Sequence, residues 1–258
     1  MVNILAIGDI FAECGVEHTS LVLRSIREQE NIDFCIANAE NASGTGISRR
    51  DYDELTDAGV DFFTLGNHAF GKKDVFELLE NEPNIIRPAN FHSSNPGRGS
   101  CVVSVFGKKI GIINIMGRVS INIPLDCPFE TVNREIEALK DKCDFFVVDF
   151  HAEATSEKIA MKYHLDSRAS VLFGTHTHVQ TADETITPQG LGYITDLGMT
   201  GALDSVLGVK KEIIISRFIK GTSQKFEYAY SRAALCGAVF TIDDTTNLCT
   251  KIKRINVV

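Results

Sequence analysis

The sequence of 258 residues lacks any run of the roughly 18 apolar residues that a membrane-spanning helix needs. Its N-terminus also lacks a basic stretch followed by an apolar segment, so we expect no secretory signal peptide. The seven cysteines include no Cys-x-x-Cys pair, and their number is odd. These absences disfavour a membrane protein and a disulfide framework, and we expect a protein of the reducing cytoplasm.

An excess of positive charge is absent as well, because 26 Lys and Arg residues oppose 34 Asp and Glu residues and give a net charge of −8. We therefore expect no general binding to nucleic-acid backbones. A small phosphate substrate is still compatible with this charge, since bound metal ions can make a site locally positive. Repeats, low-complexity tracts and linkers are also missing. Residues 1–258 are predicted to form a single domain with a hydrophobic core.

Strand-like and helix-like segments alternate through the first two thirds of the chain. The apolar periodicity predicts helices at residues 15–28, 50–58, 73–79, 129–140 and 156–162. Residues 101–105 and 109–115 flank a short turn and predict a hairpin. The last third is predicted to be mostly antiparallel, with strands near residues 192–196, 226–231, 237–242 and 249–257. This order favours an α/β fold built as a mixed two-sheet sandwich.

The most informative motif is Gly174-Thr175-His176-Thr177-His178, which follows the apolar run 169–173. His176 and His178 would share one face of a continuing strand, or turn toward one point in a tight loop that Gly174 favours. In either arrangement two neutral imidazoles converge, and such nitrogen ligands suit zinc, iron or manganese. His-x-His also occurs by chance, so the interpretation depends on what the other strands contribute.

Four further apolar runs end in residues that can bind a metal ion. The residues that follow these runs are Asp9, Glu40, Asn41, Asn67, His68 and His151. Because open α/β sheets place their sites beyond the carboxyl ends of strands, we expect these residues to meet the His-x-His motif.

Each of these residues also has a simpler interpretation when it is considered alone. Asp9 could cap a helix, Asn67 could be a turn residue, and His151 could be a hydrogen-bonded imidazole of the core. His68 could be a further metal ligand. Five strand ends of this kind favour one shared site. Two neighbouring acids are expected to be structural: Asp149, which shares a face with His151, and Glu153, which is expected to begin a helix.

The eight candidate residues exceed the three to five protein ligands of one open metal site. Two ions that share a bridging carboxylate would use seven of them, and such ions lie about 3.5–4 Å apart. Asp9 and Glu40 are the only anions among the candidates, so two divalent ions leave the cluster positive. A positive cluster that binds oxygen favours a phosphate substrate.

Gly8-Asp9, Gly66-Asn67-His68, His151 and the His-x-His motif resemble the calcineurin-like metallophosphoesterases in order and spacing. Most members have Asp-x-His at the first strand, whereas this chain has Phe11, which cannot bind a metal, at the third position. Glu40 with Asn41 beside it replaces the usual bridging Asp. This variant resembles the YmdB-like branch, which contains bacterial phosphodiesterases linked to cyclic nucleotides. The resemblance covers nearly the whole chain and implies an α/β/β/α sandwich of the metallophosphoesterase type.

The resemblance also implies roles for the candidate residues. One metal ion would be bound by Asp9, Glu40, Asn41 and His178, and the other by Glu40, Asn67, His151 and His176. Asn41 would fill the place left by Phe11. His68 would protonate the leaving oxygen while a metal-bridging hydroxide attacks phosphorus. Two iron or manganese ions per chain are the expected cofactors.

The function implied by the resemblance is hydrolysis of a small phosphodiester, in particular a 2′,3′-cyclic nucleotide, by a metal-dependent enzyme. Two alternatives stay open. One is a phosphomonoesterase, such as a nucleotidase or protein phosphatase, that uses the same cluster. The other is a regulatory metal-dependent nucleotide-binding protein that acts through a partner. A homo-oligomer is expected by family analogy only, because the sequence itself does not reveal the oligomeric state.

Overall fold

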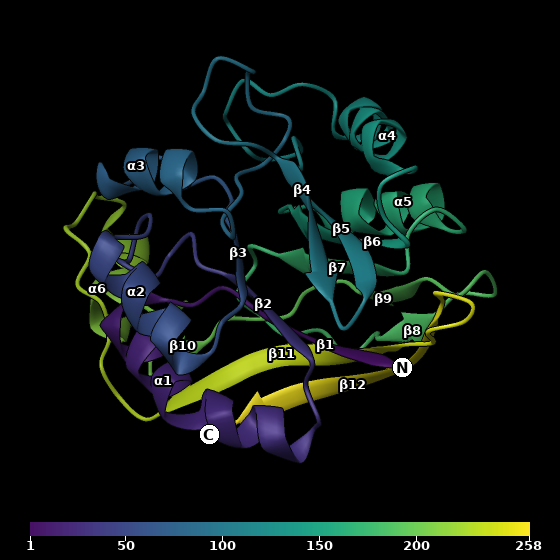
Figure 1. Cartoon of the computed structure of the whole chain (residues 1–258). Helices are drawn as coiled ribbons and strands as arrows, with labels where there is room; N and C mark the ends of the chain where they lie inside the picture. The colour runs from purple at the N-terminus through teal and green to yellow at the C-terminus, as the bar shows by residue number, and fades with distance from the viewer.

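The computed structural model describes residues 1–258 and contains two six-stranded sheets (Figure 1). The first sheet has a parallel half made of β1 (Val2–Ile7), β2 (Phe34–Asn38) and β3 (Phe62–Thr64). β1 pairs in antiparallel fashion with β11, which in turn pairs with two further strands. β11 spans Ala233–Ile242, and the two further strands are β10 (Gly201–Ala202) and β12 (Cys249–Val257). The carboxyl ends of the three parallel strands therefore lie at one edge of the sheet.

The second sheet has the strand order β4-β5-β6-β7-β9-β8. Its first two strands form the predicted hairpin, with β4 (Ser100–Val105) antiparallel to β5 (Lys108–Met116). β5 continues into a parallel run with β6 (Phe145–His151), β7 (Val171–Thr175) and β9 (Gly192–Ile194). The short β8 (Thr185–Ile186) adds an antiparallel edge.

Helices cover the outer face of each sheet (Figure 1). The first sheet carries α1 (Ala12–Gln29), α2 (Arg49–Ala58) and α3 (Asp74–Asn81), and the second carries α4 (Pro128–Leu139) and α5 (Thr155–Leu165). The five predicted helices are confirmed, with ends that differ by a few residues. No helix combines the length and the apolar composition needed to cross a membrane.

Three apolar clusters hold these four layers together. Along β1, Leu5 and Ile7 belong to the cluster shared with α1 and α2, whereas Ile4 and Ala6 belong to the cluster shared with the second sheet. This division follows from the two-residue period of a strand, which sends alternate side chains to opposite faces. A third cluster joins the second sheet to α4 and α5. The layers confirm the predicted α/β/β/α sandwich.

The segment between β10 and β11 differs from the prediction. It contains a helix, α6 (Lys211–Lys220), that was not predicted, and none of the residues of α6 is buried. The strand predicted for residues 226–231 is wrong, because only Tyr228 forms an isolated bridge, with Val209. We call residues 203–232 the α6 segment. Its helix lies outside both sheets, and its residue Tyr228 packs against Phe11, which follows β1.

Candidate metal centre

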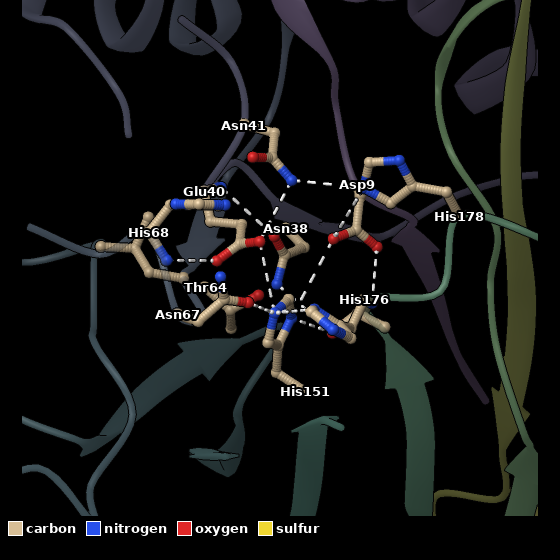
Figure 2. A network of polar contacts seen from close by, with 12 residues as sticks. Asp9, Asn38, Glu40, Asn41, Thr64, Asn67, His68, His151, His176 and His178 are labelled. Carbon is tan, nitrogen blue, oxygen red and sulfur yellow. Dashed lines mark hydrogen bonds and ion pairs between the residues drawn. The ribbon is translucent and has the colours of Figure 1, made fainter. Parts of the chain in front are cut away.

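The five predicted strand ends meet between the two sheets (Figure 2). The ends of β1, β2 and β3 supply Asp9, Glu40, Asn41, Asn67 and His68, and the ends of β6 and β7 supply His151, His176 and His178. Asn38 at the end of β2 links the sheets, because its amide donates a hydrogen bond to Asp149 on β6 at 3.1 Å. The site lies at the carboxyl ends of parallel strands, as expected for open α/β sheets.

One set of potential ligands surrounds the Nε2 atom of His151. This nitrogen lies 2.9 Å from Oδ1 of Asn67, 3.3 Å from Oε1 of Glu40 and 3.0 Å from Nδ1 of His176. One ligand atom each from Glu40, His151 and His176 lies within 4.8 Å of the other two. A single transition metal ion, with bonds of about 2 Å, can bridge atoms at this spacing.

The second set of potential ligands gathers around Asp9. Its Oδ1 atom lies 3.8 Å from Nε2 of His178. The amide nitrogen of Asn41 lies 3.2 Å from the same imidazole nitrogen and 3.1 Å from Oε1 of Glu40. A flip of this amide would present the oxygen atom that a metal ion needs. Glu40 contacts members of both sets, as a bridging carboxylate would.

Two observations show that the residues fit bound cations. The Oδ1 atom of Asp9 is buried but has no hydrogen-bond partner, and an ionised oxygen in that situation is costly unless a cation binds it. Gly66 provides the second observation. A Cβ atom at this position would lie 2.3 Å from Nε2 of His151 and 2.4 Å from Oε2 of Glu40. Gly66 therefore keeps the space among the potential ligands open.

The ionisation of the cluster also favours cation binding. Burial raises the pKa of Asp9. Burial would do the same to Glu40, but attraction to His151 and His68 lowers its pKa to about 2. Burial and repulsion from His151 lower the pKa of His176 to about 3, so this imidazole is uncharged near neutral pH and can offer a ring nitrogen to a metal ion. Burial would lower the pKa of His151, but attraction to Glu40 and Asp9 raises it to about 9, so a protonated imidazole balances the carboxylates where bound metal ions would supply the positive charge.

The His-x-His motif forms a loop after β7, as one of the two predicted arrangements has it. His176 and His178 themselves adopt positive φ angles of 99° and 64°. Gly174 has a different role from the one expected, since it lies within β7 and is not among the residues with positive φ. A Cβ atom there would lie 1.9 Å from the carbonyl oxygen of Thr195. Glycine is required at this position by close packing.

Asp149 has more than a structural role, because it orients His151 through Thr175. The Thr175 hydroxyl donates to Oδ1 of Asp149 at 2.8 Å and lies 2.9 Å from Nδ1 of His151. With its proton committed to Asp149, the hydroxyl accepts from Nδ1 of the imidazole, so Nε2 is the nitrogen that could bind a metal ion after losing its proton. Asn38 and Thr64 also donate to Asp149. The spacing of Asp149 and His151 on one strand face was the available sequence signal.

Glu153, which was predicted to begin a helix, also contacts the candidate centre. The residue precedes α5, and its Oε2 atom lies 3.1 Å from Nε2 of His176. The other ring nitrogen of His176 faces His151 at 3.0 Å. A carboxylate on the outer nitrogen fixes the imidazole so that the inner nitrogen can bind a metal. No local sequence signal distinguishes this use of Glu153.

A buried ion pair holds the backbone of the His-x-His loop in place. Nζ of Lys158 on α5 lies 2.6 Å from Oδ2 of Asp196 and donates to the carbonyl of Thr175 at 2.8 Å. Asp196 also accepts from the backbone N–H of Thr177 at 3.1 Å. Both charged side chains are 1% exposed. The pair therefore fixes the backbone on both sides of His176, although Lys158 lies far from it in the sequence.

His68 occupies a different place from the potential ligands. Its backbone N–H donates to Oε2 of Glu40 at 2.8 Å. Its side chain lines a cavity of about 490 Å³ beside the cluster, together with His176 and His178.

The helix-cap interpretation of Asp9 is not supported, because Phe11 holds the N-cap position of α1. Asp9 instead accepts from the backbone N–H of His176 at 3.0 Å.

Solved structures and curated proteins resemble this chain along its whole length. A 2′,3′-cyclic-nucleotide 2′-phosphodiesterase of Bacillus subtilis (strain 168) is 41% identical, over 98% of this chain and 96% of the relative. A crystal structure described as a novel phosphatase from Mycoplasma pneumoniae superposes with a TM-score of 0.93 at 36% identity, covering 99% of this chain and 93% of that one.

A more distant structure shares the fold alone. The 5′-nucleotidase precursor of Thermus thermophilus has a TM-score of 0.61 at 13% identity, covering 100% of this chain and 54% of that chain.

The sequence pattern of the YmdB-like protein family matches residues 5–255. Since this match and the relatives both span nearly the whole chain, the chain belongs to the YmdB-like protein family.

Proposed function

We propose that this chain is a dinuclear metal-dependent phosphodiesterase that acts on small phosphodiesters such as 2′,3′-cyclic nucleotides. The chain is a hydrolase of phosphate esters, in agreement with its family and with the names of its relatives. The observation that carries the proposal is the convergence of Glu40, His151 and His176 beside the unpaired Oδ1 atom of Asp9. Both sheets contribute to this site, which also supports our proposal that residues 1–258 act as one domain.

In the proposed centre, each side chain has a defined task. One metal ion would be held by Asp9, Glu40, Asn41 and His178, and the other by Glu40, Asn67, His151 and His176. The ions, iron or manganese in our proposal, would supply an activated water and neutralise charge on the transferred phosphoryl group. Thr175 and Asp149 keep Nε2 of His151 directed at the cluster. Glu153 does the same for Nδ1 of His176.

His68 is the proposed general acid. Its ring lines the cavity while its backbone is tied to Glu40, so the imidazole stands beside the reacting phosphate without being held in the cluster. A proton from this imidazole would pass to the leaving oxygen as the ester bond breaks. General acid catalysis of this kind contributes roughly 10²–10⁴-fold to the rate.

The substrate class is tested on metal-analysed protein with bis(p-nitrophenyl) phosphate, p-nitrophenyl phosphate and 2′,3′-cyclic AMP. We expect turnover of both diesters to exceed that of the monoester. The variant His176→Ala should lose activity on all three, whereas the matched variant His92→Ala, at an exposed histidine, should behave as the wild type. A preference for the monoester would favour the phosphomonoesterase alternative and overturn the proposal.

A further inference from the structure

The cavity beside the candidate centre has two chemically different sides. One side consists of the cluster residues with His68 and Glu153, and the other is apolar. The apolar side comes mainly from the α6 segment, which contributes Val206, Leu207, Val209, Ile214, Phe218, Phe226 and Tyr228. We call these residues the α6 wall, leaving out Phe218 because it is 81% exposed. The cavity has a volume of about 490 Å³, which is within the usual range of pockets for small molecules.

No Lys or Arg side chain lines the cavity, and Glu40 and Glu153 are its charged members apart from histidines. A substrate with several phosphate groups would need cations beyond the metal centre to pair with them. The part of the substrate beyond the reacting phosphate must therefore bind the cavity through apolar contacts, aromatic contacts or hydrogen bonds, and not through ion pairs with Lys or Arg.

Packing contacts hold Tyr228 of the α6 wall in place. Tyr228 packs edge-on against Phe11 with ring centroids 5.3 Å apart, and Phe11 packs edge-on against His178 at 5.5 Å. Gly44 permits this position, because a Cβ atom there would lie 2.1 Å from the Tyr228 ring. Phe11 thus connects a potential metal ligand to the wall in place of binding a metal itself.

Phe226 is held in a different way. The guanidinium of Arg217 on α6 lies over its ring, 5.2 Å from the centroid. Despite these contacts, Phe226 and Tyr228 are 42% and 41% exposed. Two partly exposed aromatic side chains with fixed surroundings, next to a candidate phosphate site, lose little conformational entropy when a flat ring stacks on them.

We propose that the α6 wall binds the nucleobase of the substrate, with Phe226 and Tyr228 as its main contacts. This inference rests on the proposed function, since the reacting phosphate is placed at the metal centre. Stacking of a base on an aromatic side chain tolerates any base identity. The wall therefore selects for nucleoside-linked phosphates over small aliphatic ones, without distinguishing strongly among bases.

The test compares two substrates that share a five-membered cyclic phosphodiester, 2′,3′-cyclic AMP and glycerol 1,2-cyclic phosphate. For Phe226→Ala and Tyr228→Leu we expect kcat/KM on the nucleotide to fall about tenfold or more, mainly through KM. Turnover of the base-free diester should stay near the wild-type value. The matched variant Tyr230→Ala changes an exposed tyrosine outside the cavity and should affect neither substrate.

Calorimetric titration of adenosine, which has no phosphate, separates this inference from the proposed function. Adenosine should bind the wild type, and Phe226→Ala should weaken the binding about tenfold. An equal loss on both cyclic diesters, or adenosine binding that is unchanged or absent, would overturn the role of the α6 wall. Failure of the metal-loaded wild type to hydrolyse either diester, with adenosine binding intact, would instead contradict the proposed function and leave base binding supported.

Discussion

The carboxylate of Glu153 lies 3.1 Å from Nε2 of His176, on the side of the ring opposite to the candidate metal cluster. The ring is thereby held between an acid at its outer nitrogen and His151 at its inner nitrogen. A histidine ligand held in this way has a defined tautomer and greater basicity. Glu153 is therefore a positioning residue for His176.

The variant Glu153→Gln is expected to weaken metal binding about 10–100-fold, because the neutral amide holds the imidazole less well. Metal affinity is measured by competition with a chelator, and activity should recover when excess metal is added. Glu137→Gln, at an exposed acid on α4, serves as the control. Unchanged metal affinity would show that the contact between Glu153 and His176 has no positioning role.

Lys158→Met should destabilise the fold strongly, since it leaves the buried carboxylate of Asp196 without its cation. Removing one partner of a buried ion pair costs roughly 3–5 kcal/mol, measured as the change in the free energy of denaturant unfolding. Lys140→Met removes an exposed lysine and should cost less than about 0.5 kcal/mol. The double variant Lys158→Met/Asp196→Asn should be more stable than the sum of the single changes predicts. Strict additivity would argue against coupling of the two residues.

Gly66→Ala is expected to prevent metal binding while leaving most of the fold intact. The added methyl would clash with side-chain atoms of His151 and Glu40 and not with the backbone, so it should displace potential ligands before it disturbs the fold. Metal content is determined by elemental analysis and folding by circular dichroism. Gly201→Ala provides the control, because its Cβ would meet its nearest atoms at 3.4 Å or more. Full metal content in Gly66→Ala would contradict the proposed position of the ions.

The strand ends could be predicted from the sequence because β1, β2, β3, β6 and β7 are buried on both faces. Their apolar runs are continuous, and the first polar residue after each run marks the edge of the sheet. The pattern of residues alone is therefore enough to place Asp9, Glu40, His151 and the His-x-His motif together. Their assignment to particular metal ions stays a prediction.

The contributions of Glu153, Lys158 and the α6 segment could not be predicted from local pattern. Glu153 and Lys158 act through contacts with residues far along the chain, which periodicity does not encode. In α6, the β-branched run Ile213-Ile214-Ile215 favours a strand, and no buried stripe marks the helix. The residues 226–231 resemble a strand, yet the aromatic side chains of Phe226 and Tyr228 line the cavity in place of pairing within a sheet.

His68→Ala separates the proposed acid from the ligands. We expect this variant to keep its metal ions and to lose about 10²–10⁴-fold in kcat, because the imidazole lines the cavity outside the cluster of Glu40, His151 and His176. The loss should be smaller for bis(p-nitrophenyl) phosphate than for 2′,3′-cyclic AMP, since p-nitrophenolate leaves without needing a proton. Loss of metal from His68→Ala would identify His68 as a ligand.

The most direct test of the central claim is a titration of metal-free protein with manganese or iron, following bound metal and diester hydrolysis in the same samples. We predict that activity is absent without metal and reaches its maximum at about two ions per chain. Asp9 and His176 belong to different proposed ligand sets. The variants Asp9→Asn and His176→Ala should each reduce the number of tightly bound ions. Metal-free protein with unchanged activity would contradict the account.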